Sequence, residues 1–192
     1  MHSPLASLSR FRSTALLALL ATAAFATVIV HETLDDLARR VPVIARGRVM
    51  RSFSAWDDGK RSIYTWTELT VTDAIKGKPG AVVLIKSYGG EVDGIGQMVA
   101  GAATFKEGED CLVFLEPTPN ERGSYMVSGL SAGKILMTTQ KGQPTAVRDT
   151  TGIAFARPAS GKVAERVLTP EFLGSPDDFV KRIRKAITGG AK

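Results

Sequence analysis

Few residues in this sequence have the types and spacing that catalysis or metal binding requires. The chain has one cysteine, Cys111, and two histidines, His2 and His31. His31 stands near Glu32, Asp35 and Asp36, but no second histidine completes an H-E-x-x-H motif. Helix capping explains those carboxylates better than a metal does. We therefore predict no catalytic residues, no metal site and no cofactor.

Cys111 opens the continuous apolar run C-L-V-F-L. Such a run is typical of a buried strand, in which cysteine behaves as a small hydrophobic residue. We interpret Cys111 as a core residue rather than a nucleophile. The alternative is an exposed odd cysteine that pairs with another chain, as occurs in exported proteins.

Residues 89–101 form a glycine-rich segment, G-G-E-V-D-G-I-G-Q-M-V-A-G. Its G-I-G lacks the third glycine of a dinucleotide-binding loop, because Val99 stands in that place. Long loops on a rigid scaffold often carry recognition, so this segment is the first candidate for a binding surface. Its candidate side chains are Tyr88, Glu91, Asp93, Gln97 and Met98.

Aromatic residues flank an Asp-Gly turn at residues 58–59. Trp56, Tyr64 and Trp66 form either a patch that binds a sugar or peptide, or a packed cross-strand cluster. Cross-strand packing is the favoured interpretation, while Trp56 and Trp66 remain candidate binding residues. The carboxylates near the turn lack the spacing of an EF-hand, so we predict no calcium site.

The first 26 residues have the pattern of a secretory signal peptide. Arg10 and Arg12 precede the apolar block 15–25, and an A-x-A site ends at Ala26. Cleavage after Ala26 predicts a secreted or periplasmic protein. Because the apolar run continues to Val30, retention as a membrane anchor is the alternative.

Composition and charge exclude several classes of protein. The chain is 44% hydrophobic and 23% charged, which excludes a disordered or multi-span membrane protein. Much of the formal net charge of +6 comes from the signal peptide and residues 161–192. The central part is nearly neutral, so we expect no nucleic-acid groove and no nucleic-acid partner.

The mature chain alternates short β-forming runs with turns. We expect strands at 43–53, 63–75, 81–87, 111–115, 125–127, 133–138 and 145–148, with 156–169 as loop. In the first strand, Gly47, Val49 and Phe53 should share one face. Helices are expected at 33–41 and at 176–188, the second amphipathic and basic.

These runs predict a mainly β fold, a small OB-like barrel or sandwich of about six to eight strands, with a short N-terminal helix and a C-terminal amphipathic helix. The predicted organisation is a signal peptide (1–26), a β-barrel or sandwich domain (27–160) and a C-terminal extension (161–192).

Residues 28–115 resemble a broad group of exported bacterial proteins. The shared segments are T-L-D-D-L, R-G-R-V, a T-x-T-E-L-T-V strand, a K-G turn, G-G-E-V-x-G and G-E-D-C-L-V-F-L. Their order also resembles an OB-type barrel of the netrin or metalloproteinase-inhibitor kind. Those inhibitors chelate the protease metal through an N-terminal cysteine and contain several disulfides. Here the mature chain would begin at Thr27 and contain only Cys111, so the inhibitory chemistry has no residue to carry it.

Together these patterns favour an exported non-enzymatic binding or scaffold module whose partner is another exported or envelope protein. Membrane contact is expected only through an uncleaved signal peptide. An enzyme whose carboxylates Glu68, Glu91 and Asp93 converge is the alternative, and a protease-inhibitor-like module is a further one.

Overall fold

The computed structural model describes residues 27–30, 32–151, 153–156, 163–166 and 169–189. The predicted signal peptide, residues 1–26, and the predicted domain boundary at 160–161 lie outside the described residues. Among the described residues, no helix combines the length and apolar character needed to cross a membrane.

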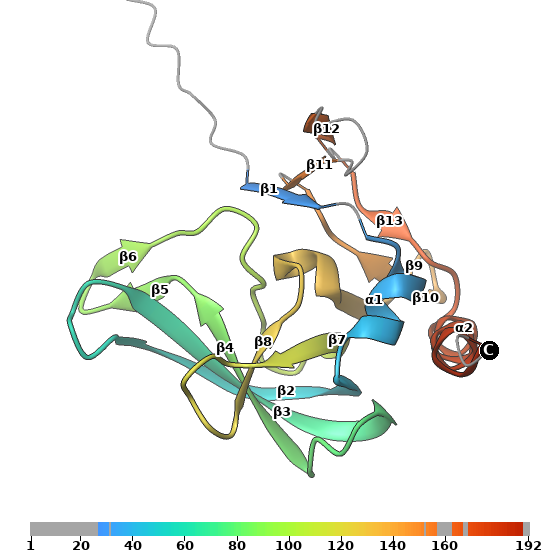
Figure 1. The fold of residues 1–192 in the computed structure, drawn as a ribbon, viewed down its shortest axis with the longest axis horizontal. Coiled ribbons are helices and arrows are strands. Elements are labelled where there is room, and N and C mark those ends of the chain that lie inside the picture. Colours follow the sequence, from blue (N-terminus) through green and yellow to red (C-terminus); the bar gives the residue numbers. More distant parts are fainter. Residues whose placement is uncertain (1–26, 31, 152, 157–162, 167–168, 190–192) are drawn as a thin grey trace, which may run out of the picture.

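A closed ring of strands forms the centre of the molecule (Figure 1). Along this ring the order within the described residues is β2, β3, β4, β8 and β7, and β7 pairs again with β2. The β4–β8 pairing is parallel and the other pairings are antiparallel. This confirms the predicted mainly β fold, and between the barrel and the sandwich that the sequence left open, the ring-like closure corresponds to the barrel. The strands are β2 (Val43–Trp56), β3 (Ile63–Lys76), β4 (Val82–Tyr88), β7 (Asp110–Pro117) and β8 (Ser124–Val127).

The sheet continues outward from β7 beyond the ring. A short 3-10 helix, η1 (Leu130–Gly133), links β8 to β9 (Lys134–Gln140), which pairs with β10 (Gln143–Arg148). The last strand, β13 (Glu171–Phe172), pairs with β10. Within the described residues this sheet has eight strands.

Two further small sheets correct the sequence-based expectations. Residues 156–169 were expected to be loop, but β12 (Val163–Arg166) pairs there with β11 (Ile153–Ala156), which also pairs with β1 (Thr27–Val30). The glycine-rich segment contains a hairpin of β5 (Gly90–Val92) and β6 (Ile95–Gln97) rather than only loop. Asp93 and Gly94 turn it with φ values of 52° and 77°, which short hairpin turns require.

Two helices cover one face of the extended sheet. Helix α1 (Leu34–Arg40) is capped by the Thr33 hydroxyl, and α2 (Pro176–Thr188) by the Ser175 hydroxyl. Both predicted helices are confirmed. They pack on each other and on the sheet around a buried cluster that includes Leu37, Phe114, Ile135, Phe179 and Ile183.

Strand β7 separates this helix–sheet core from the barrel core. Cys111, Val113 and Leu115 point into the barrel, whereas Leu112 and Phe114 face the helices. All five side chains are fully buried. A strand with cores on both sides needs apolar residues at consecutive positions, which explains the uninterrupted C-L-V-F-L run. The prediction that Cys111 is a core residue is confirmed.

Phe53 does not share a face of β2 with Gly47 and Val49, as the sequence predicted. Val49 pairs with Leu69 but Arg51 pairs with Glu68, so Met50 is an extra residue that forms a bulge. Beyond the bulge the alternation reverses, because one inserted residue exchanges the two faces of a strand. Phe53 is consequently 47% exposed on the outside of the barrel.

Candidate functional site

The outer surface of β2, β3 and β4 carries aromatic side chains in adjacent rows. Phe53 pairs with Trp66, and Trp66 pairs with Lys86; in the next row Tyr64 pairs with Tyr88. The intervening residues, such as Thr67 and Ile85, are fully buried, so these rows point outward. We call Phe53, Tyr64, Trp66, Tyr88 and Lys86 the aromatic face.

The rings of the aromatic face touch one another. Phe53 stacks on Trp66 with centroids 5.9 Å apart and planes inclined by 12°. Tyr64 meets Trp66 edge-on at 6.1 Å and lies 5.5 Å from Tyr88. The Lys86 ammonium lies 4.4 Å from the centroid of Tyr64 and 5.0 Å from that of Trp66. Ring–ring and cation–π contacts therefore hold this surface rigid.

Glu121, in the β7–β8 connection, neutralises the lysine of this surface. Its carboxylate accepts hydrogen bonds from Lys86 Nζ at 2.6 Å, Trp66 Nε1 at 3.2 Å and Ser124 Oγ at 2.9 Å. The hydrogen bond from Lys86 is the largest of the effects that lower the pKa of Glu121. Beside it, Arg51 pairs with Glu68 at 2.5 Å. The aromatic face is thus apolar with its charges paired.

Only some of the predicted aromatic residues lie together. Trp66 and Tyr88 both belong to the aromatic face. Trp56 is half-buried and pairs with Ile63 in the β2–β3 ladder. Among the described residues it makes none of the ring contacts just given. Phe53 takes the place expected for Trp56 because the bulge at Met50 turns it outward.

The candidates of the glycine-rich segment are spread along the β5–β6 hairpin. Glu91 is exposed on β5, and Asp93 lies in the turn. Gln97 has a structural role, since its side-chain oxygen accepts the backbone N–H of Ile63 at 2.6 Å. Met98, just after β6, is 93% exposed.

The structure does not bring Glu68, Glu91 and Asp93 together. Glu68 lies on the outer surface with Arg51. The hairpin root packs against the other face of β3, where a Cβ added to Gly90 would lie 2.5 Å from Thr65 Oγ1. Within the described residues, no group of three or more His, Cys, Asp or Glu side chains could hold a metal ion.

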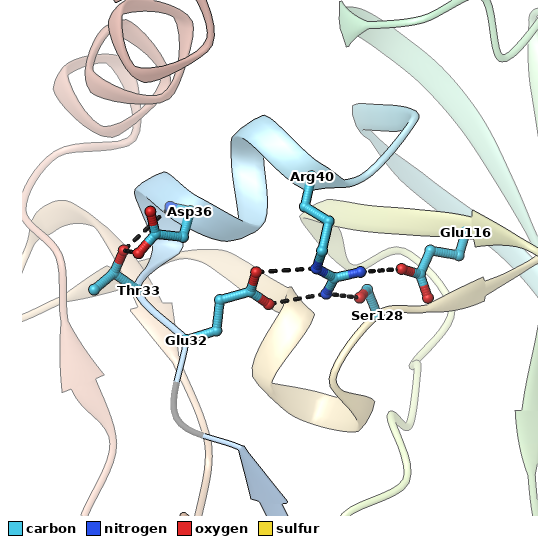
Figure 2. A network of polar contacts seen from close by, with 6 residues as sticks. All are labelled: Glu32, Thr33, Asp36, Arg40, Glu116 and Ser128. Atoms are coloured by element: carbon cyan, nitrogen blue, oxygen red, sulfur yellow. Dashed lines mark hydrogen bonds and ion pairs between the residues drawn. The ribbon is translucent and has the colours of Figure 1, made fainter. Parts of the chain in front are cut away.

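A polar network joins α1 to the barrel (Figure 2). The Arg40 guanidinium donates to both carboxylate oxygens of Glu32, at 2.9 and 2.8 Å, to Glu116, and to Ser128 Oγ at 2.9 Å. Hydrogen bonding to Glu32 contributes most to the raised pKa of Arg40. Thr33 Oγ1 accepts the Asp36 N–H at 3.1 Å. The acidic residues after His31 thus hold and cap the helix, whereas His31 itself lies outside the described residues.

The thiol of Cys111 should be unreactive in the folded protein. Burial raises its pKa to about 12, and the side chain is inaccessible. Because the thiolate is the reactive form, we expect iodoacetamide at pH 8 to modify the native chain at least about a hundredfold more slowly than the urea-unfolded chain. Mass spectrometry of timed samples measures both rates. Comparable rates would show that Cys111 is exposed.

Sequence reasoning missed Phe53, Lys86 and Glu121. The long β3 strand indicated where an aromatic surface would lie, but the partners of Trp66 depend on the strand register and on the β7–β8 connection.

No protein-family model matches the chain, and a search of curated proteins finds no match. A functional proposal therefore has to be made from the geometry of these surfaces.

Proposed function

We propose that this chain is an exported, non-enzymatic binding module, and that the aromatic face binds another exported or envelope protein. The observation that carries the proposal is the exposure of Phe53 and Tyr88, 47% and 42%, on a preorganised aromatic surface. Aromatic residues are enriched among the residues that dominate binding energy at protein interfaces. Rings that are already packed lose little conformational freedom when a partner binds.

The charge distribution favours a protein over a nucleic acid. A surface for single-stranded nucleic acid combines stacking rings with a positively charged groove. On the aromatic face, Lys86 is neutralised by Glu121, and the neighbouring Arg51 by Glu68. The signal-peptide pattern of residues 1–26 supports a partner outside the cytoplasm.

A comparative pull-down tests this proposal. The chain is expressed with its own residues 1–26 in a bacterial host, and its intact mass establishes whether cleavage follows Ala26. Wild type and the double variant Phe53→Ala/Tyr88→Ala then serve as baits for periplasmic and secreted proteins. We expect the double variant to bind the captured partner at least about tenfold more weakly, because each hot-spot truncation costs about 2 kcal/mol or more.

Phe172→Ala is the matched control. Phe172 is 64% exposed on β13, on the extension of the sheet rather than on the aromatic face. This control should capture the same partner as the wild type. Equal capture by all three proteins, or no reproducible partner for the wild type, would rule out the aromatic face as the binding surface.

A further inference from the structure

A separate cavity of about 260 Å³ lies between the end of β4, the root of the β5–β6 hairpin and the segment that follows β6. Its size is sufficient for one ring-sized molecule, since an apolar cavity of about 150 Å³ is large enough to bind benzene. The lining residues that matter here are Thr65, Ser87, Tyr88, Gln97, Ala102 and Phe105.

The lining of this cavity carries no ionisable acid or base other than the Tyr88 phenol. Its larger walls are Tyr88 and Phe105, Met98 beside them is 93% exposed, and none of the described lining residues is Asp, Glu, Lys, Arg or His. Transfer of an unpaired charge into such surroundings is costly, because lost hydration is not replaced. Because the lining offers no counter-charge, the cavity favours an uncharged ligand.

Most polar groups of the cavity already have partners. Thr65 Oγ1 donates to the Gly89 carbonyl at 2.8 Å and lies 2.9 Å from Ser54 Oγ. The Gln97 side-chain oxygen is occupied by the Ile63 N–H. The Ser87 hydroxyl, unlike the Thr65 hydroxyl and the Gln97 side-chain oxygen, makes no such hydrogen bond in the part of the chain that the structure describes.

Ser87 is only 7% exposed, and within the described residues its hydroxyl has no hydrogen-bond partner, although it borders the cavity. The hydroxyl oxygen itself remains accessible from the cavity. A ligand hydroxyl or amide placed there can exchange a hydrogen bond with it.

We propose that this cavity binds a small uncharged molecule that has a ring-sized apolar body and one hydroxyl or amide group. The apolar body packs between Tyr88 and Phe105, and the polar group exchanges a hydrogen bond with Ser87. Gln97 and Thr65 anchor the hairpin root through hydrogen bonds with the Ile63 N–H and the Gly89 carbonyl. This site shares only Tyr88 with the aromatic face and does not depend on the proposed protein partner.

Amide NMR titration of the full chain tests the proposal with three probes of one shape. Benzyl alcohol is neutral, benzoate is an anion, and protonated benzylamine is a cation at neutral pH. We expect benzyl alcohol to shift the amide signals of residues that line the cavity. Both charged probes should bind at least about tenfold more weakly, because the lining offers no counter-charge.

Two substitutions locate the binding. Ser87→Ala removes the free hydroxyl with little change of volume and should weaken benzyl alcohol binding about fivefold. Ala102→Trp fills the cavity and should abolish binding. Ala74→Trp is the control, since Ala74 is exposed on β3 and does not line the cavity. Thermal unfolding verifies that each variant is folded; if Ala102→Trp is not, Ser87→Ala decides.

Several outcomes would overturn the proposal. These are similar affinities for the three probes, shifts confined to residues remote from the cavity, wild-type affinity in Ser87→Ala or in folded Ala102→Trp, and no binding of benzyl alcohol at tens of millimolar. None of these outcomes bears on the pull-down, because its variants share only Tyr88 with the cavity.

Discussion

Replacing Phe114 by alanine is expected to lower the free energy of unfolding by about 3–5 kcal/mol. Phe114 is fully buried on β7, where its ring packs in the core that α1 and α2 form with the sheet. Truncation removes apolar contacts and leaves a cavity that the neighbouring side chains of both helices and the sheet cannot fill without moving. Urea unfolding followed by circular dichroism measures the loss.

Phe172→Ala is the matched control for this prediction, because the same atoms are removed from a side chain that is 64% exposed. Its effect should lie within about 0.5 kcal/mol of zero. If both variants lost the same stability, Phe114 would not be packed between the barrel and the helices.

Replacing Gly47 by alanine should also destabilise the protein, by about 1–3 kcal/mol. Gly47 lies in β2 between its partners in β3 and β7. A Cβ atom there would lie 2.3 Å from the Thr70 carbonyl oxygen and 2.9 Å from Leu69 Cγ. The backbone of β3 would have to move, because neither atom is the free end of a flexible side chain.

Whether Gly47→Ala destabilises or stabilises the protein tests how closely β2 and β3 approach. Alanine in place of glycine within a strand ordinarily stabilises by about 0.5–1 kcal/mol, since the unfolded chain loses freedom. Gly96→Ala tests this baseline, because a Cβ at Gly96 in β6 meets nothing within 4 Å. We expect Gly96→Ala to be neutral or slightly stabilising in the same urea experiment. A stabilising Gly47→Ala would contradict the close approach of β2 and β3.

The features that were predicted correctly are those that depend on neighbouring residues. Thr33 and Ser175 each cap a helix whose first turn is acidic, and Pro176 begins α2. These signals act within one turn, so they are visible in the sequence. The apolar run of β7 was likewise visible, because burial on both faces removes the polar alternation.

The charge of the C-terminal helix shows the limit of such reasoning. From the sequence, its basic residues are interpreted as the solvated outer face of a docked helix. In the structure, Arg182 pairs with Asp35 and Arg184 with Asp73, which are more than a hundred positions away in the chain. Much of its basic face therefore serves to attach α2 to α1 and to β3.

The sequence by itself determined the helices, the buried strand and the β-rich class, because propensity, capping and hydrophobic pattern act over a few residues. Only the tertiary structure decided the two surfaces proposed for binding. The bulge at Met50 places Phe53 on Trp66, and the β7–β8 connection brings Glu121 to Lys86. Ser87, the hairpin root and Phe105 come from separate segments and line one cavity. These contacts depend on register and closure, which pairings between distant segments establish.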